Sequence, residues 1–256
     1  VSKEVINVRE NVGLIEVANF SKHEFKGPDA RKFLDHIMAG RLPKPGRISL
    51  SPMLSYRGKL CGDLTVACLD ENEFMVFGSG AAQEMHRRWF ESHLDKFNLS
   101  YSNRSDEYHG LSIAGPNSRK VLEKIVRDDV SNEKFKFRDS RRMFVGGVPA
   151  IINRISFTGE LGYEIYVAPH YQLKLYEELM EAGKEFNIKP FGGRALMSMR
   201  LEKNWGAWTL DYRPDFTAKE TGLDAFINWD KEFIGKESAQ KENSSNKLVP
   251  LIVETN

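Results

Sequence analysis

The alternation of apolar and polar residues predicts a chain of strands and short amphipathic helices. Gly146 and Gly147 separate two short strand patterns and favour a hairpin turn. The segments with the period of two that is typical of strands are residues 62–68, 73–77, 143–145, 150–157 and 163–167. The segments with apolar residues at helical spacing are residues 81–95, 171–182 and 193–203.

An internal repeat organises the first two thirds of the chain. Residues 25–35 (FKGPDARKFLD) recur as residues 113–123 (IAGPNSRKVLE), and each copy follows a strand pattern. In both copies Gly-Pro marks the change from strand to helix, because proline suits the first helical turn, where its missing N–H has no partner to lose. The repeat predicts an α+β fold of duplicated strand–helix units with antiparallel sheets.

The repeat also predicts a division of the chain. We expect a first α+β unit at residues 1–104, a second at residues 105–210 and a C-terminal segment at residues 211–256. Within that last segment, residues 248–253 (LVPLIV) have a strand pattern. A terminal strand needs a partner, so it either completes a sheet of this chain or begins a further domain.

Composition and charge exclude several classes of function. The chain has 256 residues, of which 41% are hydrophobic and 29% charged, as in globular proteins. A net charge of +1 gives no reason to expect nucleic acid or an anionic membrane as partner. No apolar run reaches the roughly 18 residues of a spanning helix, and the first residues lack a signal-peptide core. Cys61, Cys68 and the six histidines show no metal-binding spacing, so we expect no metal and a cytoplasmic location.

Candidate chemistry rests on carboxylates within strand patterns. Glu164 stands among strong strand formers and shares a face with Tyr166, so it either faces solvent or is held inside by donors. Asp63 and Thr65 share a strand face in the same way, and a solvated face is the alternative there too. Arg194 falls in the first turn of a predicted helix, where the helix dipole disfavours a cation, which suggests a specific anionic or planar partner. Such a set suits a neutral ligand with several N–H donors, such as a pterin or purine edge.

Four motifs, in this order, carry a resemblance to a known family. They are residues 12–17 (VGLIEV), 158–164 (TGELGYE), 194–203 (RALMSMRLEK) and 233–236 (FIGK). Over essentially its whole length the chain resembles the aminomethyltransferase (glycine-cleavage T protein) family. Within it, the chain is most similar to the C-terminal folate-binding module of dimethylglycine dehydrogenase, dimethylglycine oxidase and sarcosine dehydrogenase.

The resemblance implies a fold and an activity. The fold would be glycine-cleavage T protein-like, with a C-terminal β-barrel domain missing or only begun at residues 248–253. The chain would bind tetrahydrofolate and accept a one-carbon unit from an amine-derived methylene or iminium group, forming methylenetetrahydrofolate. FAD would belong to a separate domain or a flavoprotein partner. The mitochondrial matrix would replace the cytoplasm in a eukaryote.

The resemblance also implies roles residue by residue. Asp63 matches the key carboxylate near the folate nitrogens that take up the carbon, and Glu164 matches the glutamate that holds the pterin. Thr65 and Phe77 match positions that line the folate, and Arg194 matches an arginine of the folate site. We expect Asp63 to be ionised at neutral pH, with a pKa near the ordinary value of about 3.9.

Two further positions qualify this assignment. Glu160 falls in the folate-binding motif and is expected to fix its turn. Phe157 stands where the dehydrogenase branch has tyrosine, so one hydroxyl contact to folate is lost, at a cost of about 0.5–1.5 kcal/mol. A non-catalytic folate-binding protein of the same fold, an inactive scaffold and the stand-alone aminomethyltransferase of the glycine cleavage system are the alternatives.

Overall fold

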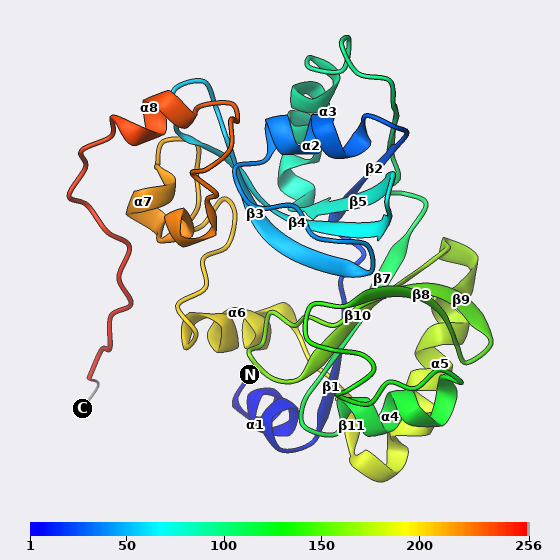
Figure 1. Cartoon of the computed structure of the whole chain (residues 1–256). Coiled ribbons are helices and arrows are strands. Elements are labelled where there is room, and N and C mark those ends of the chain that lie inside the picture. Colours follow the sequence, from blue (N-terminus) through cyan, green and yellow to red (C-terminus); the bar gives the residue numbers. More distant parts are fainter. Residues whose placement is uncertain (255–256) are drawn as a thin grey trace.

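Two β-sheets lie face to face, with helices on both outer faces (Figure 1). The computed structural model describes residues 1–254. Helices α2 and α3 cover the outer face of one sheet, and α4 and α5 cover the outer face of the other. A buried cluster from both sheets, which includes Phe77 and Tyr166, fills the space between them. The predicted α+β class with antiparallel sheets is confirmed.

The strands form a five-stranded and a six-stranded sheet. All neighbours pair antiparallel except β1 and β11, which are parallel. The five-stranded sheet has the order β3 (Arg47–Leu54), β4 (Leu60–Asp70), β5 (Glu73–Gly78), β2 (Ser21–Lys26) and β6 (Ser100–Asn103). The six-stranded sheet has the order β11 (Ile188–Pro190), β1 (Val12–Glu16), β7 (His109–Ala114), β10 (Gly162–Val167), β9 (Val148–Asn153) and β8 (Ser140–Val145).

The helices are short and most carry one apolar face. The α-helices are α1 (Ser2–Glu10), α2 (Ala30–Ile37), α3 (Gln83–Glu91), α4 (Ser118–Ile125), α5 (Gln172–Gly183), α6 (Gly193–Leu201), α7 (Ala218–Thr221) and α8 (Lys236–Gln240). Short 3₁₀ turns lead into α3 and α5. The helix predicted over residues 81–95 is therefore shorter than expected and begins with a 3₁₀ turn.

The internal repeat is visible in the backbone. Gly27 and Gly115, at the ends of β2 and β7, both have a positive φ, 133° and 128°. A Cβ on either glycine would meet backbone atoms closer than 3.0 Å, so only glycine fits. Helices α2 and α4 then begin two residues after the proline of each Gly-Pro pair. The two predicted strand–helix switches are confirmed.

Two sequence predictions need correction. The strand predicted over residues 150–157 ends at Asn153, because the following residues turn away from β10. Residues 248–253 form no strand in the described part of the chain. One backbone bond, from the Leu248 N–H to the Glu220 carbonyl at 2.7 Å, holds the start of this segment, and Ile252 is 95% exposed. The strand pattern alone does not suffice, because no sheet edge lies beside it.

Among residues 1–254, no helix is both long and apolar enough to cross a bilayer.

Candidate functional site between the two sheets

A row of buried polar residues crosses the six-stranded sheet on its inner face. The register pairs Glu164 on β10 with Asn153 on β9 and with Ser112 on β7, and pairs Asn153 with Ser140 on β8. All four are buried, and Glu164 is only 7% exposed. A solvated Glu164 is therefore wrong. Residues paired directly across antiparallel strands point to the same side, so these side chains adjoin one another.

The Glu164 carboxylate oxygens accept few of the hydrogen bonds that they could accept. Its Oε2 accepts a bond of 2.8 Å from the Tyr166 hydroxyl, the only side-chain hydrogen bond to this carboxylate in the described chain. The predicted shared face of Glu164 and Tyr166 is confirmed. Burial raises the pKa of Glu164 to about 7, and the Tyr166 bond only partly opposes this. The carboxylate is thus costly to ionise until further donors reach it.

The five-stranded sheet supplies the opposite wall. The Phe77 ring stacks on the Tyr166 ring with centroids 4.5 Å apart, and Phe77 pairs with Thr65 across β5 and β4. Asp63 lies two residues before Thr65, and their neighbour Leu64 packs into the core on the other face. A continuous row of side chains therefore crosses the space between the sheets. It runs from Asp63 and Thr65 past Phe77 and Tyr166 to Glu164.

Asp63 differs from expectation in its protonation. The residue keeps some exposure, but protein atoms enclose its carboxyl group, and this burial raises its pKa to about 7. The expected pKa near 3.9 is wrong, because the sequence cannot show how the loop after α6 closes over β4. Burial also raises the pKa of the Tyr212 phenol in that loop, and the nearby charge of Asp63 adds to it.

The loop after α6 spans both sheets. At its start the Trp205 ring stacks on Phe157 with centroids 6.0 Å apart, and further on Trp208 and Tyr212 pack around Leu60 of β4. Arg200, buried at the end of α6, holds the loop through an ion pair with Asp211 and a 2.8 Å bond to the Trp205 carbonyl. The Phe157 ring therefore packs against this loop, and its predicted place in the folate site stays a prediction.

The turn that contains Glu160 is fixed by its own polar groups. The Glu160 N–H donates to Thr158 Oγ1 at 3.2 Å, and Thr158 Oγ1 also bonds Ser156 Oγ at 2.7 Å. Gly159 has a φ of 82°, and a Cβ there would meet the Lys203 side chain. Glu160 is half-buried. The bond uses the backbone N–H of Glu160, which any residue would offer, so both the turn-fixing role of Glu160 and its ligand contact stay predictions.

Arg194 is not drawn into the site. It lies exposed in the first turn of α6, and it forms no ion pair within residues 1–254. Its predicted folate contact therefore stays a prediction.

Sequence reasoning missed Asn153 and Lys22. Lys22 is buried on β2, where Nζ bonds the Ala18 carbonyl at 2.6 Å and lies 5.9 Å from the centre of the Tyr166 ring. Burial lowers its pKa to about 8. Lys22 stands between Ser21 and His23, so the local sequence carries no signal for its burial. For Asn153, only the strand register shows that it lies beside Glu164.

One groove lies outside this site. A groove of about 400 Å³ between β1 and α5, lined by Leu14, Leu173 and Tyr176 among others, includes none of the predicted site residues. Within residues 1–254, no group of three His, Cys, Asp or Glu side chains could hold a metal ion.

The fold and the matching sequence model together define the class of protein. The model of the GCVT N-terminal domain matches residues 1–231, so the chain belongs to this family. The solved aminomethyltransferase T of the glycine cleavage system from Bartonella henselae has the same fold, with a TM-score of 0.84 and 23% identity over 93% of this chain and 65% of that one.

Two kinds of relative match the sequence. The chain is 36% identical to mitochondrial dimethylglycine dehydrogenase from Mus musculus, over 100% of this chain and 30% of the relative. It is 31% identical to an aminomethyltransferase from Desulfitobacterium hafniense, over 95% of this chain and 68% of the relative. The chain thus spans about three tenths of the length of the dehydrogenase.

Proposed function

We propose that this chain binds tetrahydrofolate between its two sheets. The observation that carries the proposal is Glu164, a buried carboxylate with one hydrogen bond and a pKa of about 7. A pterin edge offers adjacent N–H donors, which a carboxylate accepts in bidentate fashion. Family membership supports the same ligand.

In this proposal the two walls have different tasks. Glu164 holds the pterin edge, while Thr65 and Phe77 line the folate from the five-stranded sheet. Arg194, Phe157 and Glu160 are proposed to contribute at the margin of the folate site.

We further propose that the bound folate accepts one carbon from an amine-derived methylene or iminium group. A folate nitrogen attacks the electrophilic carbon of the iminium, a C–N bond forms as the C=N π electrons pass to the amine nitrogen, and the folate nitrogen becomes cationic until it loses its proton. The second folate nitrogen then displaces the amine, which leaves in its protonated form. Asp63 stabilises the folate cation and accepts its proton. A carboxyl group with a pKa of about 7 suits this task, because a general base works best when its pKa lies near the working pH.

The carbon donor is proposed to be of the dimethylglycine or sarcosine type, since a dimethylglycine dehydrogenase is among the relatives. Its oxidation would need FAD in another domain or a flavoprotein partner. The compartment, cytoplasm or mitochondrial matrix, stays a prediction.

Calorimetric titration of the chain with tetrahydrofolate at pH 8, under reducing conditions, tests the proposal. We expect micromolar binding. A titration without heat for tetrahydrofolate, and likewise for its 5-methyl and 5-formyl forms, would contradict it.

A further inference from the structure

Asn153 is a buried amide with half of its hydrogen-bonding groups unused. It is fully buried at the end of β9, and its Oδ1 accepts a bond of 2.7 Å from the Ser140 hydroxyl. Its Nδ2, with two N–H donors, has no partner within residues 1–254. An unpaired buried donor is destabilising, so it needs a reason.

The register places this donor beside Glu164. Asn153 and Glu164 are direct partners across β9 and β10. Direct partners in an antiparallel sheet have Cβ atoms about 4.5–5.5 Å apart and point to the same side. That side is the inner one, because Ile151, two residues before Asn153, belongs to the cluster between the sheets.

Glu164 and Asn153 therefore offer a ligand an acceptor and a donor side by side. Glu164 requires donors from a ligand, and Asn153 Nδ2 requires an acceptor. In the structure the Ser140 hydroxyl donates to the Asn153 carbonyl oxygen, which leaves the NH₂ group free. A ligand that satisfies both has N–H donors and a carbonyl oxygen along a single edge.

We propose that Asn153 determines specificity by donating to the 4-oxo group of the ligand whose N–H groups bind Glu164. In a 2-amino-4-oxopteridine the amino group, the ring N–H and the carbonyl oxygen follow one another in this order. A 2,4-diaminopteridine replaces the carbonyl acceptor by an amino group, which faces the NH₂ group of Asn153. Its N3 also carries no hydrogen, which weakens the bond to Glu164 whatever residue stands at position 153. This inference rests on the proposed folate function and deepens it.

The experiment compares tetrahydrofolate with its 4-amino-4-deoxy analogue by calorimetry at pH 8. We expect the unaltered protein to prefer the 4-oxo ligand by about 10- to 100-fold, the range for a buried polar group left unpaired. Asn153→Leu is close in size and lacks the donors. It should bind tetrahydrofolate about 10-fold more weakly, and the preference should fall by about the same factor.

Asn7→Leu is the matched control. Asn7 is also buried, but its amide is already used, bonding the Val12 carbonyl of β1 at 2.8 Å, and β7 and β10 lie between β1 and β9 in the sheet. Its loss should lower stability and leave the ratio of the two affinities unchanged. The ratio therefore separates a local contact from a general weakening of the fold.

The outcomes separate the two proposals. If the unaltered protein binds neither ligand, the folate function itself fails. If it binds both equally well, or if Asn153→Leu keeps the full preference, the folate function stands and the role of Asn153 is overturned. Should Asn153→Leu fail to fold, Asn153→Ala takes its place, since it also lacks the NH₂ donors; a full preference for the 4-oxo ligand in that variant would overturn the role of Asn153.

Discussion

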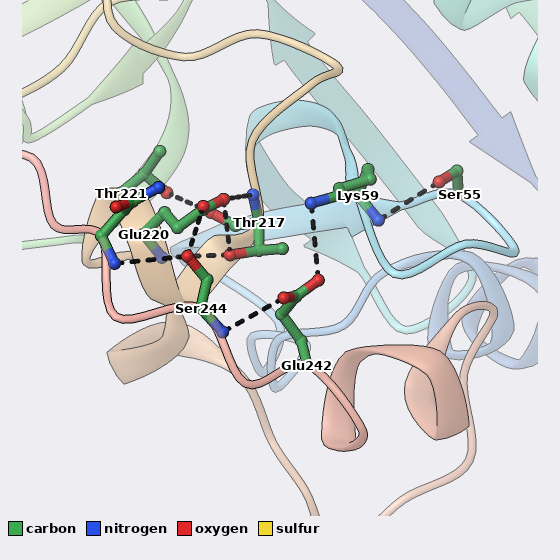
Figure 2. Close-up of polar contacts among 8 residues, drawn as sticks. Ser55, Lys59, Thr217, Glu220, Thr221, Glu242 and Ser244 are labelled. Carbon is green, nitrogen blue, oxygen red and sulfur yellow. Dashed lines mark hydrogen bonds and ion pairs between the residues drawn. The ribbon is translucent and has the colours of Figure 1, made fainter.

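Glu164 and Glu220 show two opposite ways of placing a carboxylate in this protein. Glu220, in α7, accepts bonds from the Thr217 N–H at 2.8 Å, the Thr217 hydroxyl at 3.0 Å and the Ser244 hydroxyl at 2.7 Å (Figure 2). The Ser244 bond and then the Thr217 backbone bond lower its pKa. Glu164 has one hydrogen bond, and burial raises its pKa to about 7.

The number of hydrogen bonds distinguishes a structural carboxylate, Glu220, from a candidate ligand-binding one, Glu164. The bonds of Glu220 cap α7 and tie down the C-terminal segment through Ser244 and the Leu248 N–H, so every oxygen is already used. Glu164 is held between two sheets with its capacity unmet, which is costly for folding and useful for a ligand rich in donors. Glu164→Gln and Glu220→Gln should therefore change the stability of the protein at pH 8 in opposite directions.

The largest effect is expected at Asp63, the other carboxyl group whose pKa burial raises to about 7. Asp63→Asn should slow the formation of methylenetetrahydrofolate by about 10²- to 10⁴-fold, because the proton acceptor is lost. The affinity for tetrahydrofolate should change only a few-fold. Rate measurements under saturating folate, beside calorimetry, check this. An equal loss of affinity and rate would make Asp63 a structural residue.

Glu164→Gln should stabilise the folded protein at high pH. The pKa of Glu164 rises from an ordinary 4.5 to about 7 on folding. Its contribution is fully present below the unfolded pKa and is lost as the pH rises through 7, at a cost of about 3 kcal/mol. Urea unfolding should show little difference between the variant and the unaltered protein at pH 4.5, and a more stable variant at pH 8. A variant less stable at both values would refute the account.

Glu220→Gln is the matched control for that experiment. Because folding lowers the pKa of Glu220, its contribution is present above the ordinary value of 4.5 and lost as the pH falls. This variant should be less stable than the unaltered protein at pH 8, the reverse of Glu164→Gln.

Thr217→Ala removes the cap of α7 without touching the space between the sheets. Thr217 Oγ1 accepts from the Glu220 N–H at 3.1 Å, as in a capping box. We expect a loss of about 1 kcal/mol in the free energy of unfolding, with unchanged folate affinity. Weakened folate binding in this variant would remove the contrast between the two regions.

The smallest effect is expected at Phe157, beside Trp205. Phe157→Tyr adds the hydroxyl that the resemblance predicts at this position in the dehydrogenase branch. One added hydrogen bond should raise the affinity for tetrahydrofolate by about 2- to 10-fold. An unchanged affinity would show that the hydroxyl does not reach the ligand.

Local signals in the sequence were sufficient for some of these features. The Gly-Pro switches at Gly27 and Gly115 follow from local sterics, and the shared face of Glu164 and Tyr166 follows from the strand period. The opposite wall does not, because Phe77 reaches Tyr166 from another sheet. The partner of Asn153 depends on strand register, which is a property of the assembled sheet.

The protonation of the buried carboxyl groups is harder to predict from the sequence than the strand–helix switches. The raised pKa values of Asp63 and Glu164 depend on what encloses each carboxyl group, including the loop after α6. The missing strand at residues 248–253 has a similar cause, since a strand pattern specifies a strand only beside a free sheet edge.

Tetrahydrofolate titration of Glu164→Gln and Glu220→Gln at pH 8 tests the central claim most directly. The account predicts that Glu164→Gln binds about 100-fold more weakly than the unaltered protein, because the charge-assisted bonds to the pterin are lost, while Glu220→Gln binds within about twofold of it. Glu164→Gln binding as tightly as the unaltered protein would contradict the account.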